Sequence, residues 1–181
     1  MRNGSIKLIE NDNTSRIGMV RVAMLLVALF CFRQAFAADA LWIDNPTEIS
    51  YSVGELTDAA KALGLSNSSL SGTLADGLSA AGLTPKPAAY SNDKSVLFLD
   101  IIVEEQTYYA SLGFWRVATY QRPDGEQNSD FVIVWQDYSV GAHHDDPAAI
   151  TSTIQQIIER FIVTYGAANH LERPLQAAAN P

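Results

Sequence analysis

Cysteine is nearly absent from this chain, in which Cys31 is the only one among 181 residues. A single cysteine forms no disulfide within the chain, so scaffolds held together by disulfides are excluded. Glycine and proline are also infrequent, at 11 and 7 residues, which excludes collagen-like and low-complexity classes. Because 48% of the residues are hydrophobic, the class that remains is an ordinary globular domain.

Basic residues are scarce as well, with 12 Lys and Arg against 20 Asp and Glu and a net charge of −8. Affinity for nucleic acid comes mainly from clustered Lys and Arg, so the composition argues against a nucleic-acid partner. The chain also lacks the G-x-S-x-G, P-loop, G-x-G-x-x-G, H-E-x-x-H and EF-hand motifs. These absences favour a non-catalytic protein, and the sequence predicts no cofactor.

No apolar run is long enough to span a bilayer, which needs about 20 residues. The run at 22–32 has 11 residues; Arg21 precedes it and Ala35-Phe36-Ala37 follows it. A basic start, a short apolar run and an A-x-A box are the three parts of a secretory signal. We therefore predict cleavage after Ala37 and a periplasmic or secreted protein, with an N-terminal membrane anchor as the alternative.

The predicted signal peptide, 1–37, is longer than the segment 19–37 that contains all three parts of a secretory signal. Residues 1–18 are polar, so the expected true start is Met19. Removal of 1–37 also removes Cys31 and leaves 144 residues with 7 basic and 18 acidic side chains, a net charge of −11. A domain so acidic is not expected to bind anionic membrane surfaces once the signal is cleaved.

Three segments rich in Val, Ile, Leu and aromatic residues predict strands at 95–105, 107–121 and 130–140. The connections between them are short, which favours antiparallel pairing. Shorter strand candidates lie at 41–43 and 48–53, and 85–93 reads as a linker. The sequence thus predicts an antiparallel β-meander of three to five strands.

Helical spacing of apolar residues appears in three other segments, 55–63, 67–81 and 147–166. The last is the strongest, because Asp146 and Pro147 supply an N-cap and a first-turn proline before a stripe of isoleucines. We predict an α+β domain over 38–166, with helices packed on one face of the sheet, a long C-terminal helix and a flexible tail at 167–181. In element order this plan resembles small accessory domains of bacterial cell envelopes, including those of transport-auxiliary lipoproteins.

One strand face of the predicted sheet mixes aromatic and acidic residues. Alternation places Phe98 and Asp100 on one face of their strand, and Tyr109 and Trp115 on one face of the next. Such a face, if uncovered, would bind a partner, which we expect to be an envelope protein or a small ligand. The alternative is that other elements cover it and the aromatic residues are core. The third strand, 130–140, does not favour either face.

Charged residues also interrupt the strands at Asp100, Arg116 and Asp137. Such residues are typical of strand ends, edges or wetted positions, and the alternative is an ion-paired ladder at a cleft.

The densest polar cluster lies between the last strand and the last helix, where His143, His144, Asp145 and Asp146 follow one another. Imidazoles and carboxylates ligate divalent metals, so a metal site or a metal-dependent enzyme is the second functional hypothesis. The simpler account is that Asp145 and Asp146 complement the start of the helix while the histidines lie on a loop.

Overall fold

The computed structural model describes residues 40–171. The predicted signal sequence, its cleavage site and most of the predicted tail lie outside these residues. Within 40–171, no helix combines the length and the hydropathy that a membrane crossing requires.

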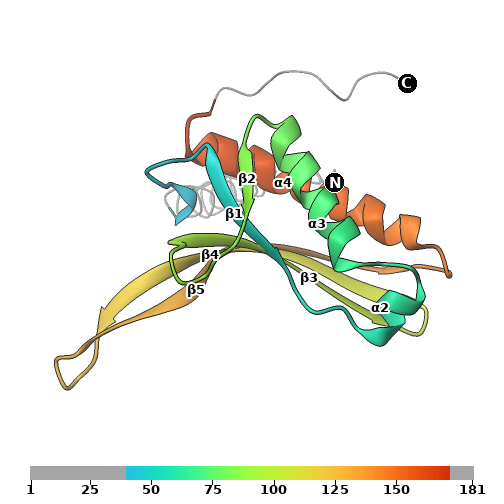
Figure 1. Cartoon of the computed structure of the whole chain (residues 1–181), viewed down its shortest axis with the longest axis horizontal. Helices are drawn as coiled ribbons and strands as arrows, with labels where there is room; N and C mark the ends of the chain where they lie inside the picture. Colours follow the sequence, from blue (N-terminus) through green and yellow to red (C-terminus); the bar gives the residue numbers. More distant parts are fainter. Residues whose placement is uncertain (1–39, 172–181) are drawn as a thin grey trace, which may run out of the picture. The chain divides into compact units, whose positions relative to one another are not determined.

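Five strands and three helices make up the described domain (Figure 1). Their order and bounds are β1 (Glu48–Val53), α2 (Asp58–Ala62), α3 (Asn67–Ala80), β2 (Thr84–Pro87), β3 (Ser95–Glu104), β4 (Thr107–Gln121), β5 (Gln127–Ala142) and α4 (Pro147–Ala168). The domain therefore belongs to the α+β class that the sequence predicted.

The sheet is mixed, with the strand order β2-β1-β3-β4-β5. Strands β3, β4 and β5 pair with antiparallel neighbours, whereas β1 is parallel to both β2 and β3. The expectation of a purely antiparallel sheet was wrong. The parallel pairing of β1 with β2 follows from the two helices that connect them, because a strand that returns through a helical crossover runs in the same direction.

The segment 85–93, predicted as a linker, contains most of β2. This strand holds Pro85 and Pro87, and proline lacks the N–H that a central strand needs. At the outer position of the sheet only one side of the strand must pair, and there the prolines are tolerated. Pro85 and Pro87 restrict β2 to the edge of the sheet, and the same two prolines are why the sequence pattern predicted a linker there.

Apolar side chains from alternate positions of the strands meet the helices in one core. Leu97, Leu99, Ile101 and Val103 of β3 are all buried, as their spacing predicted. Helix α4 contacts β4 and β5, helix α3 contacts β1 and β2, and the two helices lie side by side (Figure 1). The Phe114 ring packs at 5.8 Å from that of Phe161 in α4.

Helix α4 begins as predicted and ends later than predicted. Asp146 is its N-cap and Pro147 opens its first turn. The helix continues past Gly166 to Ala168, and Asn169 is buried behind it. The Asn169 side chain accepts a hydrogen bond from the Ile43 N–H and donates one to the Leu41 carbonyl, each 3.0 Å long. The segment 41–43 is therefore held by the end of α4, and the prediction of a strand there was wrong.

Candidate functional site

The four aromatic and acidic residues predicted for partner binding lie on the sheet face that points away from the core. In the β3–β4 register, Phe98 pairs with Gly113 and Ile102 with Tyr109. Because side chains alternate along a strand, Phe98, Asp100, Tyr109 and Trp115 share this face. We call it the outer face and define it by residues Val96, Phe98, Asp100, Ile102, Tyr109, Trp115, Val117, Phe131, Ile133, Tyr138 and Val140.

Strand β5 joins the outer face through a β-bulge. Phe114 pairs with Trp135, but the next residue, Trp115, pairs with Ile133, so Val134 is an extra residue. An extra residue inverts the alternation on its far side. Ile133 before the bulge and Tyr138 after it consequently point to the same face, which explains why no single periodicity fits this strand.

Five of the eleven residues of the outer face are exposed, five are half-buried and Val96 is buried. Tyr138 and Val140 are 62% and 67% exposed, and Ile102, Val117 and Ile133 are each exposed by about two fifths. The Tyr109 and Tyr138 rings stack at 5.8 Å. Tyr138 of β5 is therefore not a core residue, whereas Trp135 of the same strand packs against Phe161 in the core. Phe98, Tyr109 and Trp115 are half-buried.

One end of the outer face forms an apolar pocket of about 260 Å³, which we call the aromatic pocket. The Phe98 and Trp115 rings meet edge to face at 6.2 Å, and Tyr90 meets Phe131 in the same way at 6.3 Å. Val96 completes the lining. Tyr90 comes from the loop between β2 and β3, so this loop covers part of the face. Two of the four predicted residues, Phe98 and Trp115, thus line a pocket.

The other two predicted residues lie outside the aromatic pocket. Tyr109 stacks on Tyr138, as described, and Asp100 lies beside the end of β1. A Cβ placed on Gly54 would come within 2.9 Å of the Asp100 carboxylate, so the absence of a side chain at Gly54 makes room for this carboxylate.

The outer long edge of β5 is also unoccupied by any strand of residues 40–171. This edge runs over 16 residues and contains no proline, lysine or arginine. Proline and lysine commonly protect edge strands from pairing with another chain, and β5 has neither. Its β-bulge and its two aspartates are the protecting features that it does have. Asp137, predicted as an edge or wetted charge, forms an ion pair with Arg160 of α4.

The His143–Asp146 cluster does not come together as a ligand set. His143 is buried, and its Nδ1 accepts a hydrogen bond from the Asp145 N–H, while its Nε2 has no partner among the described residues. His144 and Asp145 are exposed, with φ angles of 45° and 59°, and the Asp146 carboxylate caps α4. Across 40–171 no three His, Cys, Asp or Glu side chains are grouped to hold a metal ion.

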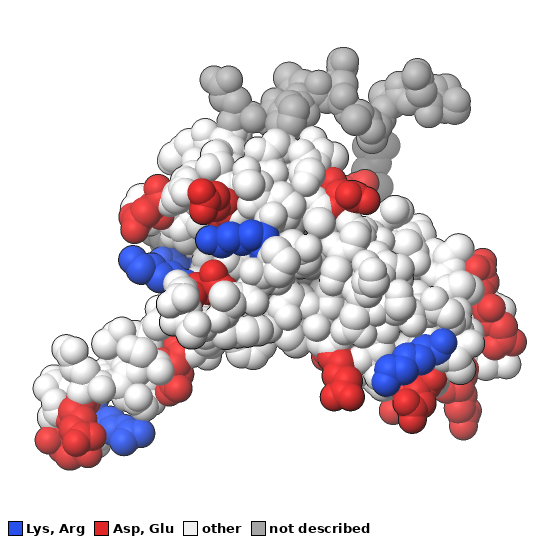
Figure 2. Space-filling model, in the orientation of Figure 1, with Lys and Arg blue, Asp and Glu red and all other residues white. Residues whose placement is uncertain are grey.

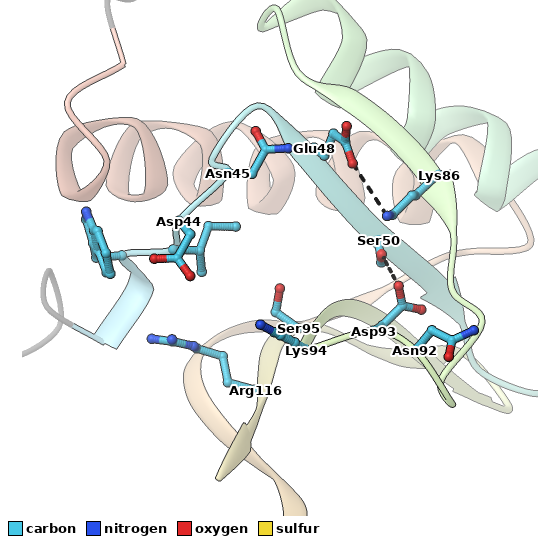
Figure 3. Close-up of a pocket in the computed structure, with 12 residues that line it drawn as sticks. Asp44, Asn45, Glu48, Ser50, Lys86, Asn92, Asp93, Lys94, Ser95 and Arg116 are labelled. Carbon is cyan, nitrogen blue, oxygen red and sulfur yellow. Dashed lines mark hydrogen bonds and ion pairs between the residues drawn. The ribbon is translucent and has the colours of Figure 1, made fainter.

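A second, polar cavity of about 310 Å³ lies beside β1 (Figure 3). We call it the polar cavity. Four stretches of chain line it: residues 42–45 before β1, Glu48 and Ser50 in β1, Lys86 in β2, and residues 92–95 leading into β3. Arg116 of β4, the direct cross-strand partner of Ser95, closes it. Figure 2 shows basic and acidic groups gathered where β1 and β2 lie in Figure 1.

Two carboxylates of the polar cavity already have partners. Lys86 and Glu48 form an ion pair of 3.6 Å, and the Ser50 hydroxyl donates a hydrogen bond of 2.7 Å to Asp93. Burial alone would raise the pKa of Asp93, but the Ser50 hydroxyl, the Ala89 N–H and the Lys86 charge together lower it below its ordinary value. Asp93 is therefore held as a carboxylate.

Sequence reasoning missed the polar cavity because its lining comes from separate segments, each of which reads as a loop or a weak strand. Only Arg116 had been singled out, as a charge inside an apolar strand. One signal was available: Lys86, Lys94 and Arg116 are half of the six basic residues within 40–171. In an acidic domain, the grouping of these few basic residues indicates a candidate binding site.

No protein-family model matches the chain, and a search of curated proteins found no relative. The proposals below therefore rest on the residues of the outer face and of the polar cavity.

Proposed function

We propose that the chain is an exported, non-catalytic accessory protein of the cell envelope that binds a protein partner through the outer face. The observation that carries this proposal is the row of exposed apolar and aromatic side chains on the outer face, next to the unoccupied edge of β5. Contiguous apolar surface of this kind on a folded domain is typical of an interaction site.

The two features suggest how a partner would be recognised. An unoccupied strand edge offers backbone N–H and C=O groups to an added strand, which supplies affinity without requiring a particular sequence. The aromatic pocket is large enough for one apolar side chain of the partner, and such buried anchors dominate binding free energies. We therefore expect a partner that pairs one extended segment with the edge of β5. A neighbouring part of the same partner would cross the outer face and place one apolar side chain in the aromatic pocket.

A photo-reactive amino acid placed at Tyr138 would test the proposed surface in the native cells. Position 138 lies on the outer face, and position 159, an exposed site on α4, is the matched control. We expect one defined crosslinked species from position 138 and none of the same mass from position 159. Equal crosslinking from both positions, or none from position 138, would overturn the proposal.

Export is a separate part of the proposal and rests on the apolar run and the A-x-A box. Intact-mass analysis of the chain from a bacterial host with a secretion system would test it. We expect a mature species that begins at Ala38 in the periplasmic or secreted fraction. Full-length chain in the membrane fraction would favour the N-terminal anchor, and full-length chain in the cytosol would contradict export.

A further inference from the structure

We propose that the polar cavity binds a small polyhydroxylated organic anion of the uronic acid type. The proposal is independent of the outer face, because the cavity lies beside β1 and draws none of its lining from the outer face. Its volume of about 310 Å³ is at the small end of ligand sites, which suits a ligand the size of one sugar ring.

The polar cavity contains charged groups that remain available to a ligand. Glu48 is paired with Lys86, and Asp93 is held by Ser50 and the Ala89 N–H. No carboxylate of residues 40–171 lies within 4.0 Å of Lys94 or Arg116. Two cations are thus left without an ionic partner in this part of the chain, in a domain that is otherwise strongly acidic.

The pairing of β3 with β4 brings Lys94 and Arg116 to one side of the polar cavity. Arg116 is the cross-strand partner of Ser95, and the Val117 N–H donates to the Lys94 carbonyl, so both cations are fixed to the same end of the β3–β4 pair. Arg116 also donates one hydrogen bond of 3.1 Å to the Ala40 carbonyl, which restrains its side chain while leaving other N–H groups available. Figure 3 shows Lys94, Ser95 and Arg116 together along one side of the cavity, with Asp44 on the other side. A carboxylate between Lys94 and Arg116 would make charge-assisted hydrogen bonds.

The remaining polar residues of the cavity favour a ligand that also carries hydroxyl groups. Asp44, Asn45 and Asn92 line the cavity, and Asp44 forms no ion pair with the described cations. An anion without hydroxyl groups would be repelled by Asp44. It would also offer no hydrogen-bond donor to the carboxylate oxygens of Asp44. Hydroxyl groups of a ligand can donate hydrogen bonds to the Asp44 carboxylate. They can also donate to and accept from the side-chain amides of Asn45 and Asn92, and they add no further negative charge next to Asp44. Trp42, 51% exposed, offers an aromatic surface to one face of a ring.

Ligand-observed NMR titration of the purified chain with glucuronate and galacturonate would test the proposal. Glucose, inorganic phosphate and glycine serve as comparison ligands, since they offer hydroxyls alone, a bare anion and a zwitterion. We expect saturable binding of at least one uronate, and binding of each comparison ligand about tenfold weaker or absent. No saturable binding of either uronate, or equal binding of glucose, phosphate or glycine, would overturn the proposal.

A pair of charge-matched variants locates the binding. The double variant Lys94→Gln/Arg116→Gln removes the two cations of the cavity, and Lys61→Gln/Arg122→Gln removes two cations elsewhere. Uronate affinity should fall about tenfold or more in the first and stay unchanged in the second, with both variants folded by circular dichroism. If the first variant does not fold, Trp42→Leu replaces it, and we expect a similar loss of affinity. Equal affinity in the cavity variant and the control would place the site elsewhere and overturn the assignment.

Discussion

The Ser50 hydroxyl donates a hydrogen bond of 2.7 Å to the Asp93 carboxylate, and this bond joins β1 to the loop that connects β2 with β3. The loop leaves the outermost strand and returns to the sheet on the other side of β1. The same loop carries Tyr90 into the aromatic pocket and Lys94 into the polar cavity. A single hydrogen bond therefore helps to position the loop that both candidate sites share.

Replacement of Asp93 by Asn should lower the free energy of unfolding at pH 7. The pKa of Asp93 is lowered in the folded state, so its stabilising contribution is present above its ordinary pKa of 3.8 and is lost as the pH falls through the lower folded value. Because the side chain is partly exposed, we expect a loss on the order of 1 kcal/mol at pH 7.

Urea unfolding of wild type and Asp93→Asn at pH 7 and pH 3 would measure this difference, with Asp76→Asn, at an exposed position of α3, as the control. The gap between wild type and the Asp93 variant should narrow at pH 3. A gap that is the same at both pH values would contradict the assigned role of the ionised carboxylate.

Substitution of Gly141 by Ala should destabilise the domain by about 1–3 kcal/mol. A Cβ at position 141 would lie 2.6 Å from the Tyr108 hydroxyl oxygen, which is already fixed by a hydrogen bond of 2.6 Å to Thr153 of α4. Thermal unfolding measures the effect. The matched control is Gly72→Ala within α3, where a Cβ meets nothing within 4 Å and helix propensity predicts a gain of up to about 1 kcal/mol. Destabilisation by both substitutions alike would argue against the packing described at Gly141.

Truncation of Asn169 to Ala should cost about 2–3 kcal/mol, because it leaves the Ile43 N–H and the Leu41 carbonyl without partners. Tyr165→Phe provides a comparison, since it removes only the hydroxyl that donates to the Pro46 carbonyl and should cost about 1 kcal/mol. Chemical denaturation of both variants tests this order. A smaller loss for Asn169→Ala than for Tyr165→Phe would show that the 41–43 segment does not depend on the end of α4.

The long, regular elements could be predicted from the sequence, and the features that depend on pairing partners could not. Strands β3 and β4 were located to within a residue, because alternation with one buried face leaves a clear period. The inversion at Val134 arises only when β5 pairs with β4, so no period within β5 reveals it.

The same distinction applies to the candidate sites. Phe98 and Trp115 could be placed together from alternation within their own strands. The polar cavity could not, because Trp42, Lys94 and Arg116 meet only after β1 has paired with β3. Tyr90 was missed for a similar reason, since nothing in its own loop indicates which face that loop crosses.

If the outer face binds a protein partner, the yield of the crosslink from position 138 must depend on Trp115, and a Trp115→Ala background measures that dependence. Trp115 lines the aromatic pocket, so the yield should fall about tenfold or more while the variant remains folded by circular dichroism. An unchanged yield of the same crosslinked species in the folded variant would show that the partner does not bind through the outer face.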